Sequence, residues 1–168
     1  MSTELNDYEE IKIEKATSSS NDKSTKPEYA LDGKQDTRWS AKGEGEFLVI
    51  DLGKVHKVAA LAIKWFESDI RRMTYTMYSG TDKNSYARIG AAVSSGIPDN
   101  EYEVHSFGRP IDAQYLKIEG EGNDLNSFIS IVDIKALGPK PAETLAVGDT
   151  GKAETVTAEP KKQNQQKA

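Results

Sequence analysis

The chain has 168 residues, a formal net charge of −5 and no cysteine. This length fits one domain with extensions at its ends, and the acidic balance argues against general nucleic-acid binding, which requires a basic face. The absence of cysteine excludes a disulfide framework and a cysteine zinc site. No apolar run approaches the roughly 18 to 20 residues of a membrane span, so we expect no membrane insertion.

Residues 1–9 are polar and acidic, and we expect them to form a flexible N-terminus. After them come short segments in which apolar and polar residues alternate or apolar residues run together, and both patterns are typical of strands. Clusters of Gly, Pro, Asn and Asp separate several of these segments, as turns would. The predicted strands lie within residues 10–17, 46–53, 55–66, 73–80, 102–107, 114–120 and 130–138.

The apolar run in 46–53 predicts a strand buried on both faces, whereas 55–66 places Leu61, Ile63 and Trp65 on one face. No window of eleven or more residues shows a helical stripe. The prediction is therefore an all-β fold, an antiparallel jelly-roll β-sandwich of about eight strands. Residues 139–168 contain no aromatic residue and predict a disordered linker or tail, which leaves 10–138 as the folded domain.

Sequence motifs of common catalytic sites are missing. There is no metalloprotease HExxH, no phosphate-binding Walker loop and no nucleophile elbow. The two histidines, His56 and His105, fall in a predicted turn and on a predicted strand. Each is better explained as a solvent-facing or hydrogen-bonded side chain than as a general base. We therefore expect that the protein is not an enzyme.

The stretch ALDGKQDTRWS, residues 30–40, gathers oxygen-bearing side chains around a glycine. Asp32, Asp36 and Thr37 offer the hard oxygen donors that calcium prefers, and Gly33 permits a tight turn. The spacing is not that of an EF-hand, because Lys34 stands at the third position of the loop. From the residues alone, a calcium site built partly from backbone carbonyls and an ordinary Asx turn both remain open.

Residues 30–53 resemble the opening of the discoidin domain, also called the coagulation factor V/VIII C-type domain. That superfamily includes the family 32 carbohydrate-binding modules. The segment SIVDIKALG, residues 130–138, resembles the closing strand of the same domain. The resemblance covers about residues 10–138 and implies a galactose-binding-domain-like jelly roll. Its opening pattern, A-x-D-G-x-x-x-T-x-W followed by D-L-G, is matched by Ala30, Asp32, Gly33, Thr37, Trp39 and Asp51-Leu52-Gly53.

The discoidin resemblance also implies a structural calcium ion near both ends of the domain. Carried over, Asp32, Thr37 and Asp133 would supply side-chain oxygens, and Trp39 would lie beneath the loop as part of the core. Asp133 stands where glutamate is commoner and is one methylene shorter. The implied backbone carbonyls are those of Tyr29, Lys34, Thr37 and Val132.

A narrower resemblance links residues 38–53, 63–72 and 119–134 to modules attached to alginate lyases and related polysaccharide-active enzymes. The sequence departs from them at Tyr86, where tryptophan is usual, and at Gln114, where arginine is frequent. Such modules imply a ligand site on two loops at one end of the sandwich, where an arginine could hold a uronate carboxylate. The candidate ligand-binding residues are Phe66, Asp69, Arg71, Arg72, Asn123 and Asn126, with Asp124 on the second loop.

The leading hypothesis is a non-catalytic carbohydrate-binding module that recognises a glycan, with an acidic polysaccharide as one candidate. The alternative is a structural, decoration or attachment protein of a virion or surface assembly with the same fold. The C-terminal tail is a candidate link to a larger assembly or an enzyme. Both hypotheses place the protein outside the cell or on a virion or cell surface, although the N-terminus shows no secretory signal. Phospholipid binding is disfavoured, because no predicted loop offers consecutive exposed apolar residues.

Overall fold

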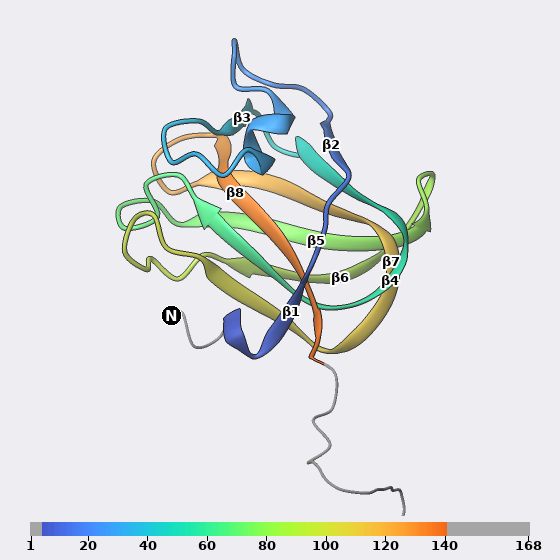
Figure 1. Ribbon diagram of the computed structural model, residues 1–168. Coiled ribbons are helices and arrows are strands. Elements are labelled where there is room, and N and C mark those ends of the chain that lie inside the picture. Colours follow the sequence, from blue (N-terminus) through green and yellow to red (C-terminus); the bar gives the residue numbers. More distant parts are fainter. Residues whose placement is uncertain (1–4, 141–168) are drawn as a thin grey trace, which may run out of the picture.

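The computed structural model describes residues 5–140, which form eight strands and one short 3-10 helix (Figure 1). All strand pairs are antiparallel, and the sheet order is β1-β8-β4-β7-β5-β6, with β2 added to β4 and β3 added to β8. The predicted all-β jelly-roll fold is confirmed. The elements are β1 Tyr8–Ile11, β2 Lys15–Ser18, η1 Pro27–Leu31, β3 Trp39–Lys42, β4 Phe47–Trp65, β5 Met73–Asp82, β6 Ser85–Val93, β7 Glu103–Asn123 and β8 Phe128–Pro139.

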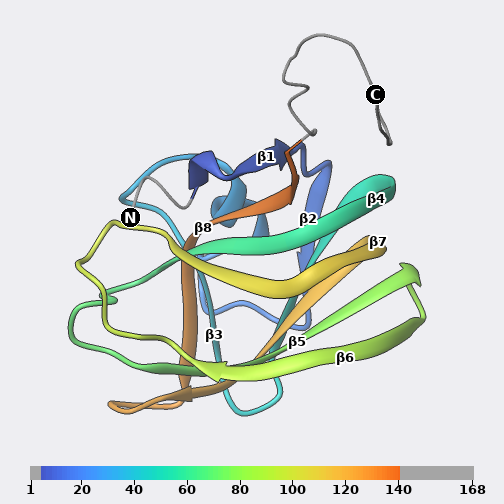
Figure 2. The ribbon, with the colours of Figure 1, turned by 90° about the horizontal axis from the view of Figure 1, so that it is seen from below.

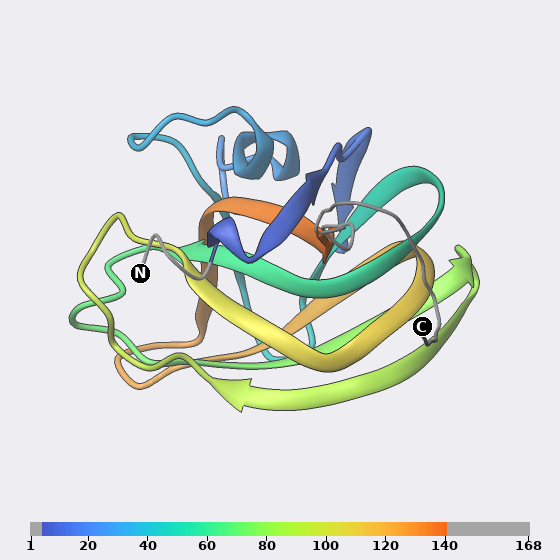
Figure 3. The same cartoon turned by 60° about the horizontal axis from the view of Figure 1, so that its bottom comes forward.

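The long strands β4 and β7 pass through both layers of the sandwich, so one continuous sheet curls upon itself (Figure 3). The first part of β4, residues 47–51, pairs with β2 and with residues 115–119 of β7. The later part pairs with residues 103–113 of β7 and with β8. The ladder is interrupted between Asp51 and His56, where Gly53 adopts a φ of 85°. Glycine tolerates this left-handed conformation, and the strand turns from one layer into the other there.

Three details of the strand prediction are wrong. The segments 46–53 and 55–66 belong to one bent strand, as do 102–107 and 114–120, because β4 and β7 pair with each other on both sides of the bend. Conversely, residues 10–17 divide into β1 and β2, because the chain leaves β8 and joins β4. The edge strand β6, at the free side of the β5–β6 hairpin (Figure 2), and the short β3 were not expected. Most side chains of β6 are at least partly exposed, so its sequence carries no apolar alternation.

The run 46–53 is also not buried on both faces. Its side chains alternate, so that Leu48, Ile50 and Leu52 are buried while Phe47, Val49 and Asp51 are half-buried. The alternation arises because a second layer covers only one face of this part of the sheet. The other face is open to solvent and forms the floor of a cavity.

The main core lies between the two layers, and both tryptophans are fully buried in it, as expected. The indole N–H of Trp39 donates to the backbone carbonyl of Ser20 at 3.0 Å, which ties the loop before η1 to the core. A smaller cluster of Ala60, Ala62 and Leu137 covers the other face of β4. Small side chains suit this face because N-terminal residues and part of β7 pack closely against it.

The ends of the domain lie side by side, because β1 pairs with the end of β8. Strand β1 begins at Tyr8, two residues before the expected start of the domain at residue 10. The predicted tail over 139–168 lies outside the described residues except for Pro139 and Lys140. None of the helices within residues 5–140 has the length and apolar character that crossing a membrane requires.

Candidate functional site

The two predicted ligand loops lie at the same end of the sandwich, as expected. Residues 66–72 connect β4 to β5 and residues 124–127 connect β7 to β8; both loops project on the left in Figure 1. The backbone amide of Arg72 donates to the Asp124 carboxylate at 3.0 Å and joins the loops directly. We call Arg38, residues 66–72 and residues 123–127 the loop surface.

Phe66 is half-buried in the loop surface, and two arginines lie over its ring. The Arg38 guanidinium lies 3.9 Å from the centroid of the Phe66 ring, and that of Arg71 lies 5.2 Å from it. Arg71 is also held by its Nε, which is 2.7 Å from Glu67 Oε1. Cation–π contacts restrict both guanidiniums, and the ion pair restricts that of Arg71 further.

Arg38 was not among the predicted site residues. The Arg38 Nε donates to Ser40 Oγ at 3.1 Å, which leaves the terminal NH₂ groups outside the hydrogen bonds found within residues 5–140. The arginine immediately precedes Trp39, whose burial fixes the backbone at this point. The position of Arg38 next to Trp39 was the one feature of the sequence that could have pointed to it. The contact between Arg38 and Phe66 depends on how the chain folds.

The remaining residues of the first loop differ in their exposure. Asp69 is exposed. The Arg72 guanidinium packs on Gly96, where an added Cβ would lie only 2.3 Å from Arg72 Cζ. Two exposed apolar side chains were not predicted at this end: Ile70 on the first loop and Leu125 on the second, with exposed fractions of 55% and 59%. They add apolar area to a charged surface.

Asn123 serves mainly to shape the second loop. Its Nδ2 donates to Asn126 Oδ1 at 2.8 Å and to the Phe128 carbonyl at 2.9 Å. Its Oδ1 accepts from the amides of Leu125 and Asn126 at 2.8 and 3.0 Å. These are the bonds of an Asx turn. Asn126 is exposed, and its side-chain NH₂ group takes no part in these bonds, so a ligand role remains predicted for Asn126.

The predicted metal ligands come from η1, the loop after it and β8. Asp32 Oδ2 accepts from the Thr37 hydroxyl at 2.6 Å, and Asp32 Oδ1 accepts from the Lys34 amide at 3.0 Å. Gly33, with a φ of 74°, completes the turn. Tyr29 lies within η1 and Val132 within β8. The Asp32 carboxylate and the Thr37 hydroxyl therefore lie in contact within this turn, and both are oxygen donors of the kind that a hard cation prefers.

Asp133 is the buried member of this set, with 5% exposure. Its carboxylate accepts a hydrogen bond from the Tyr102 hydroxyl, a partner that the sequence did not indicate. Burial raises the pKa of the Asp133 carboxyl, against the effect of this hydrogen bond and of nearby lysines, and the charge of Asp32 adds to the rise. Among the described residues, no three His, Cys, Asp or Glu side chains are placed so that they could hold a metal ion together. The donor set fits calcium only if carbonyls complete it.

Comparisons with known proteins agree with this architecture. The family model of the F5/8 type C domain matches residues 15–134. One similar solved structure is truncated AlyQ with CBM32 and alginate lyase domains, which is 30% identical in sequence to this chain and superposes with a TM-score of 0.76. The match covers 80% of this chain and 34% of the AlyQ chain. The chain thus spans about a third of that two-domain protein. No curated protein sequence matches the chain.

Two further solved structures are isolated modules. The CBM32 of AlyQ in complex with 4,5-unsaturated mannuronic acid is 32% identical with a TM-score of 0.73, covering 76% of this chain and 97% of that one. A pectin-binding carbohydrate-binding module is 25% identical with a TM-score of 0.71, covering 85% and 98%. The similarity therefore concerns family 32 carbohydrate-binding modules, which are non-catalytic, although some of the similar chains are domains of enzymes.

Proposed function

The chain belongs to the F5/8 type C domain family and has the fold of a carbohydrate-binding module, and on this basis we propose that it binds an acidic glycan through the loop surface. The observation that carries the proposal is the stack of Arg38, Phe66 and Arg71. Guanidinium groups bind carboxylates in a planar, bidentate manner, and they are oriented in advance here. Two of the similar modules, one in complex with 4,5-unsaturated mannuronic acid and one that binds pectin, point to the same chemistry.

The loop surface provides for both parts of a uronate residue. The arginines supply donors for its carboxylate, while Phe66, Ile70 and Leu125 supply apolar area for its C–H faces. The protein carries a net charge of −5, so its attraction for a long polyanion is local to basic patches such as this surface. We expect modest affinity that weakens as salt is added.

Calorimetric titration of the full chain with oligouronates and with neutral oligosaccharides of equal length tests the proposal. Arg71→Ala and Arg38→Ala should each raise the Kd for the oligouronate about tenfold, as expected for loss of a charge-assisted hydrogen bond. Arg109→Ala is the matched control, since Arg109 is an exposed arginine of β7 outside the loop surface. Equal binding of neutral sugars, or unchanged affinity in both loop variants, would refute the proposed site.

We further propose that calcium binds at the Asp32 turn. Asp32, Thr37 and Asp133 would hold the ion with side-chain oxygens, and Tyr29, Lys34 and Val132 with carbonyls. The support is the contact between the Asp32 carboxylate and the Thr37 hydroxyl, together with the buried Asp133 carboxyl, on which the charge of Asp32 acts. When bound, the cation would stabilise the ionised carboxylates and tie η1 to β8. Its role would be structural, so binding would add to the free energy of unfolding.

Thermal unfolding with calcium and with EDTA tests the metal site. At one hundred times its Kd, calcium should add about 2.7 kcal/mol to the free energy of unfolding. Asp32→Ala should remove the difference between calcium and EDTA. Asp36→Ala should retain it, because Asp36 is exposed in the same loop but lies outside the proposed ligand set. If EDTA leaves the melting temperature of the wild type unchanged, the turn is an ordinary Asx turn.

A further inference from the structure

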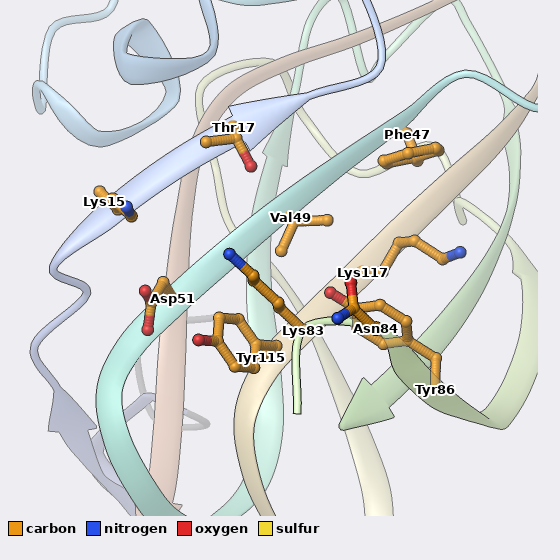
Figure 4. Close-up of a pocket in the computed structure, with 10 residues that line it drawn as sticks. All are labelled: Lys15, Thr17, Phe47, Val49, Asp51, Lys83, Asn84, Tyr86, Tyr115 and Lys117. Carbon is orange, nitrogen blue, oxygen red and sulfur yellow. The ribbon is translucent and has the colours of Figure 1, made fainter. Parts of the chain in front are cut away.

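A cavity of about 410 Å³ lies on the open face of the sheet beside the β5–β6 hairpin (Figure 4). Its floor consists of side chains that alternate with core residues, so they face away from the core. Asp51 of β4 pairs with Lys15 of β2 on one side and with Tyr115 of β7 on the other. In the next row Val49 pairs with Lys117. None of these residues belongs to the loop surface or to the proposed calcium site.

The tip of the β5–β6 hairpin forms one wall of the cavity. Gly80 pairs with Tyr115, and the β5–β6 ladder is irregular between Ser79 and Asp82. A Cβ at Gly80 would lie 2.5 Å from the Ser85 carbonyl oxygen and 3.3 Å from Tyr86 Cδ1, so only glycine permits this close approach. Tyr86 and Lys83 thereby line the cavity from the hairpin side (Figure 4).

The cavity is locally basic in an acidic protein. Lys15, Lys83 and Lys117 line it, against the single carboxylate of Asp51. Asp51 Oδ1 already accepts from the Gly53 amide at 2.8 Å and from Gln114 Nε2 at 3.1 Å, which offsets part of its charge. Three ammonium groups around one compensated carboxylate favour an anionic ligand.

Three aromatic rings restrict the position of the Lys117 ammonium group. Lys117 Nζ lies 4.9 Å from the ring centroid of Phe47, 4.7 Å from that of Tyr78 and 4.9 Å from that of Tyr86. These cation–π contacts restrict the lysine before any ligand arrives. Phe47, Tyr86 and Tyr115 also offer apolar area and hydroxyl groups within the cavity. Aromatic faces, hydroxyls and fixed cations together are what recognition of a sugar that carries a carboxylate requires.

We propose that this cavity is a second binding site, which takes a uronate residue of an acidic polysaccharide. Its volume falls in the range of about 300 to 1,000 Å³ that is usual for small-ligand sites. The ten-residue strand β5 runs from the loop surface to the hairpin at the cavity, so at about 3.3 Å per residue the two sites are about 30 Å apart. One chain would then engage a long polysaccharide at two points, which raises avidity without new contacts.

A nuclear magnetic resonance titration of the ¹⁵N-labelled full chain tests the inference, with a galacturonate trimer and a neutral galactose trimer as probes. The galacturonate trimer should shift amide signals at Asn84, Tyr86 and Lys117, and the neutral trimer should not. Arg71→Ala should leave these cavity shifts intact. Shifts confined to the loop surface would overturn the second site and leave the proposed function standing. No shift anywhere would overturn both.

Variants of the cavity provide an independent check. Lys83→Ala removes one charge from an exposed turn, so the fold should persist. The Kd for the galacturonate trimer, read from the cavity signals, should rise about fivefold in Lys83→Ala and by a similar factor in Tyr86→Ala. Lys26→Ala is the control, since Lys26 is exposed and does not line the cavity. The cavity assignment is wrong if Lys83→Ala and Tyr86→Ala bind the galacturonate trimer as tightly as Lys26→Ala does.

Discussion

The two tryptophans provide a matched pair of substitutions, Trp39→Phe and Trp65→Phe. Both side chains are fully buried, so each change leaves a similar void in the same core. They differ in one polar atom. The Trp39 indole N–H donates to the Ser20 carbonyl at 3.0 Å, whereas the Trp65 N–H has no hydrogen-bond partner among residues 5–140. The pair therefore isolates the contribution of that atom.

The void should cost each variant about 1–3 kcal/mol, below the cost of complete truncation to alanine. Trp39→Phe also loses a hydrogen bond, which adds about 1 kcal/mol. Trp65→Phe removes a buried, unpaired donor whose desolvation costs about 1–3 kcal/mol, so this gain offsets the void. A phenyl ring at position 65 also retains an aromatic contact with Tyr75, whose ring centroid lies 4.7 Å from that of Trp65. Trp39→Phe should therefore be the less stable variant by about 2–4 kcal/mol.

Urea unfolding of the full chain, followed by far-ultraviolet circular dichroism, measures this difference directly. In thermal unfolding it should appear as about 6–12 °C between the two midpoints, at about 3 °C per kcal/mol. The wild type supplies the reference, and equal m-values would show that both variants unfold to similar states. If Trp65→Phe loses as much stability as Trp39→Phe, the Trp65 N–H is satisfied in solution and the reasoning is refuted.

Three further outcomes are expected. Burial lowers the pKa of His105, so below about pH 6.5 the unfolded chain binds a proton more readily than the folded chain does. The melting temperature of the wild type should therefore fall as the pH is lowered, and that of His105→Gln should fall less steeply. Gly120→Ala should cost about 1–3 kcal/mol, because its Cβ would lie 2.4 Å from Ile129 Cδ1, whereas Gly90→Ala, with no atom within 4 Å, should change the urea midpoint little. Asn123→Ala should lower stability by about 1–3 kcal/mol and weaken oligouronate binding, since four hydrogen bonds of the loop depend on its side chain; unchanged calorimetry would contradict this.

The class of fold was readable from the sequence because it depends on local pattern. Alternation in residues 73–80 predicts one buried face, and Tyr75 and Met77 are indeed buried. The Asp32, Gly33 and Thr37 turn is likewise local, since its hydrogen bonds join residues at most five positions apart. The burial of Trp39 in a polar stretch followed from the same motif.

The partners of the site residues followed from long-range pairing instead. Arg38 and Phe66 are 28 positions apart and meet only because β3 and β4 both pair with β8. Tyr102 meets Asp133 across 31 positions. Neither contact has a sequence signal, because side-chain periodicity states which face a residue occupies but not which strand will lie beside it.

The sequence alone thus determined the alternating strands, the oxygen-rich turn and the two loops that carry the predicted ligand residues. The tertiary structure alone decided that β4 and β7 bend through both layers, that Arg38 joins the loop surface, and that Lys117 sits among three rings. The physical reason is the register of the curled sheet. A shift of one residue would exchange Phe47, Val49 and Asp51 with the core residues between them, and the cavity with its charges would no longer exist.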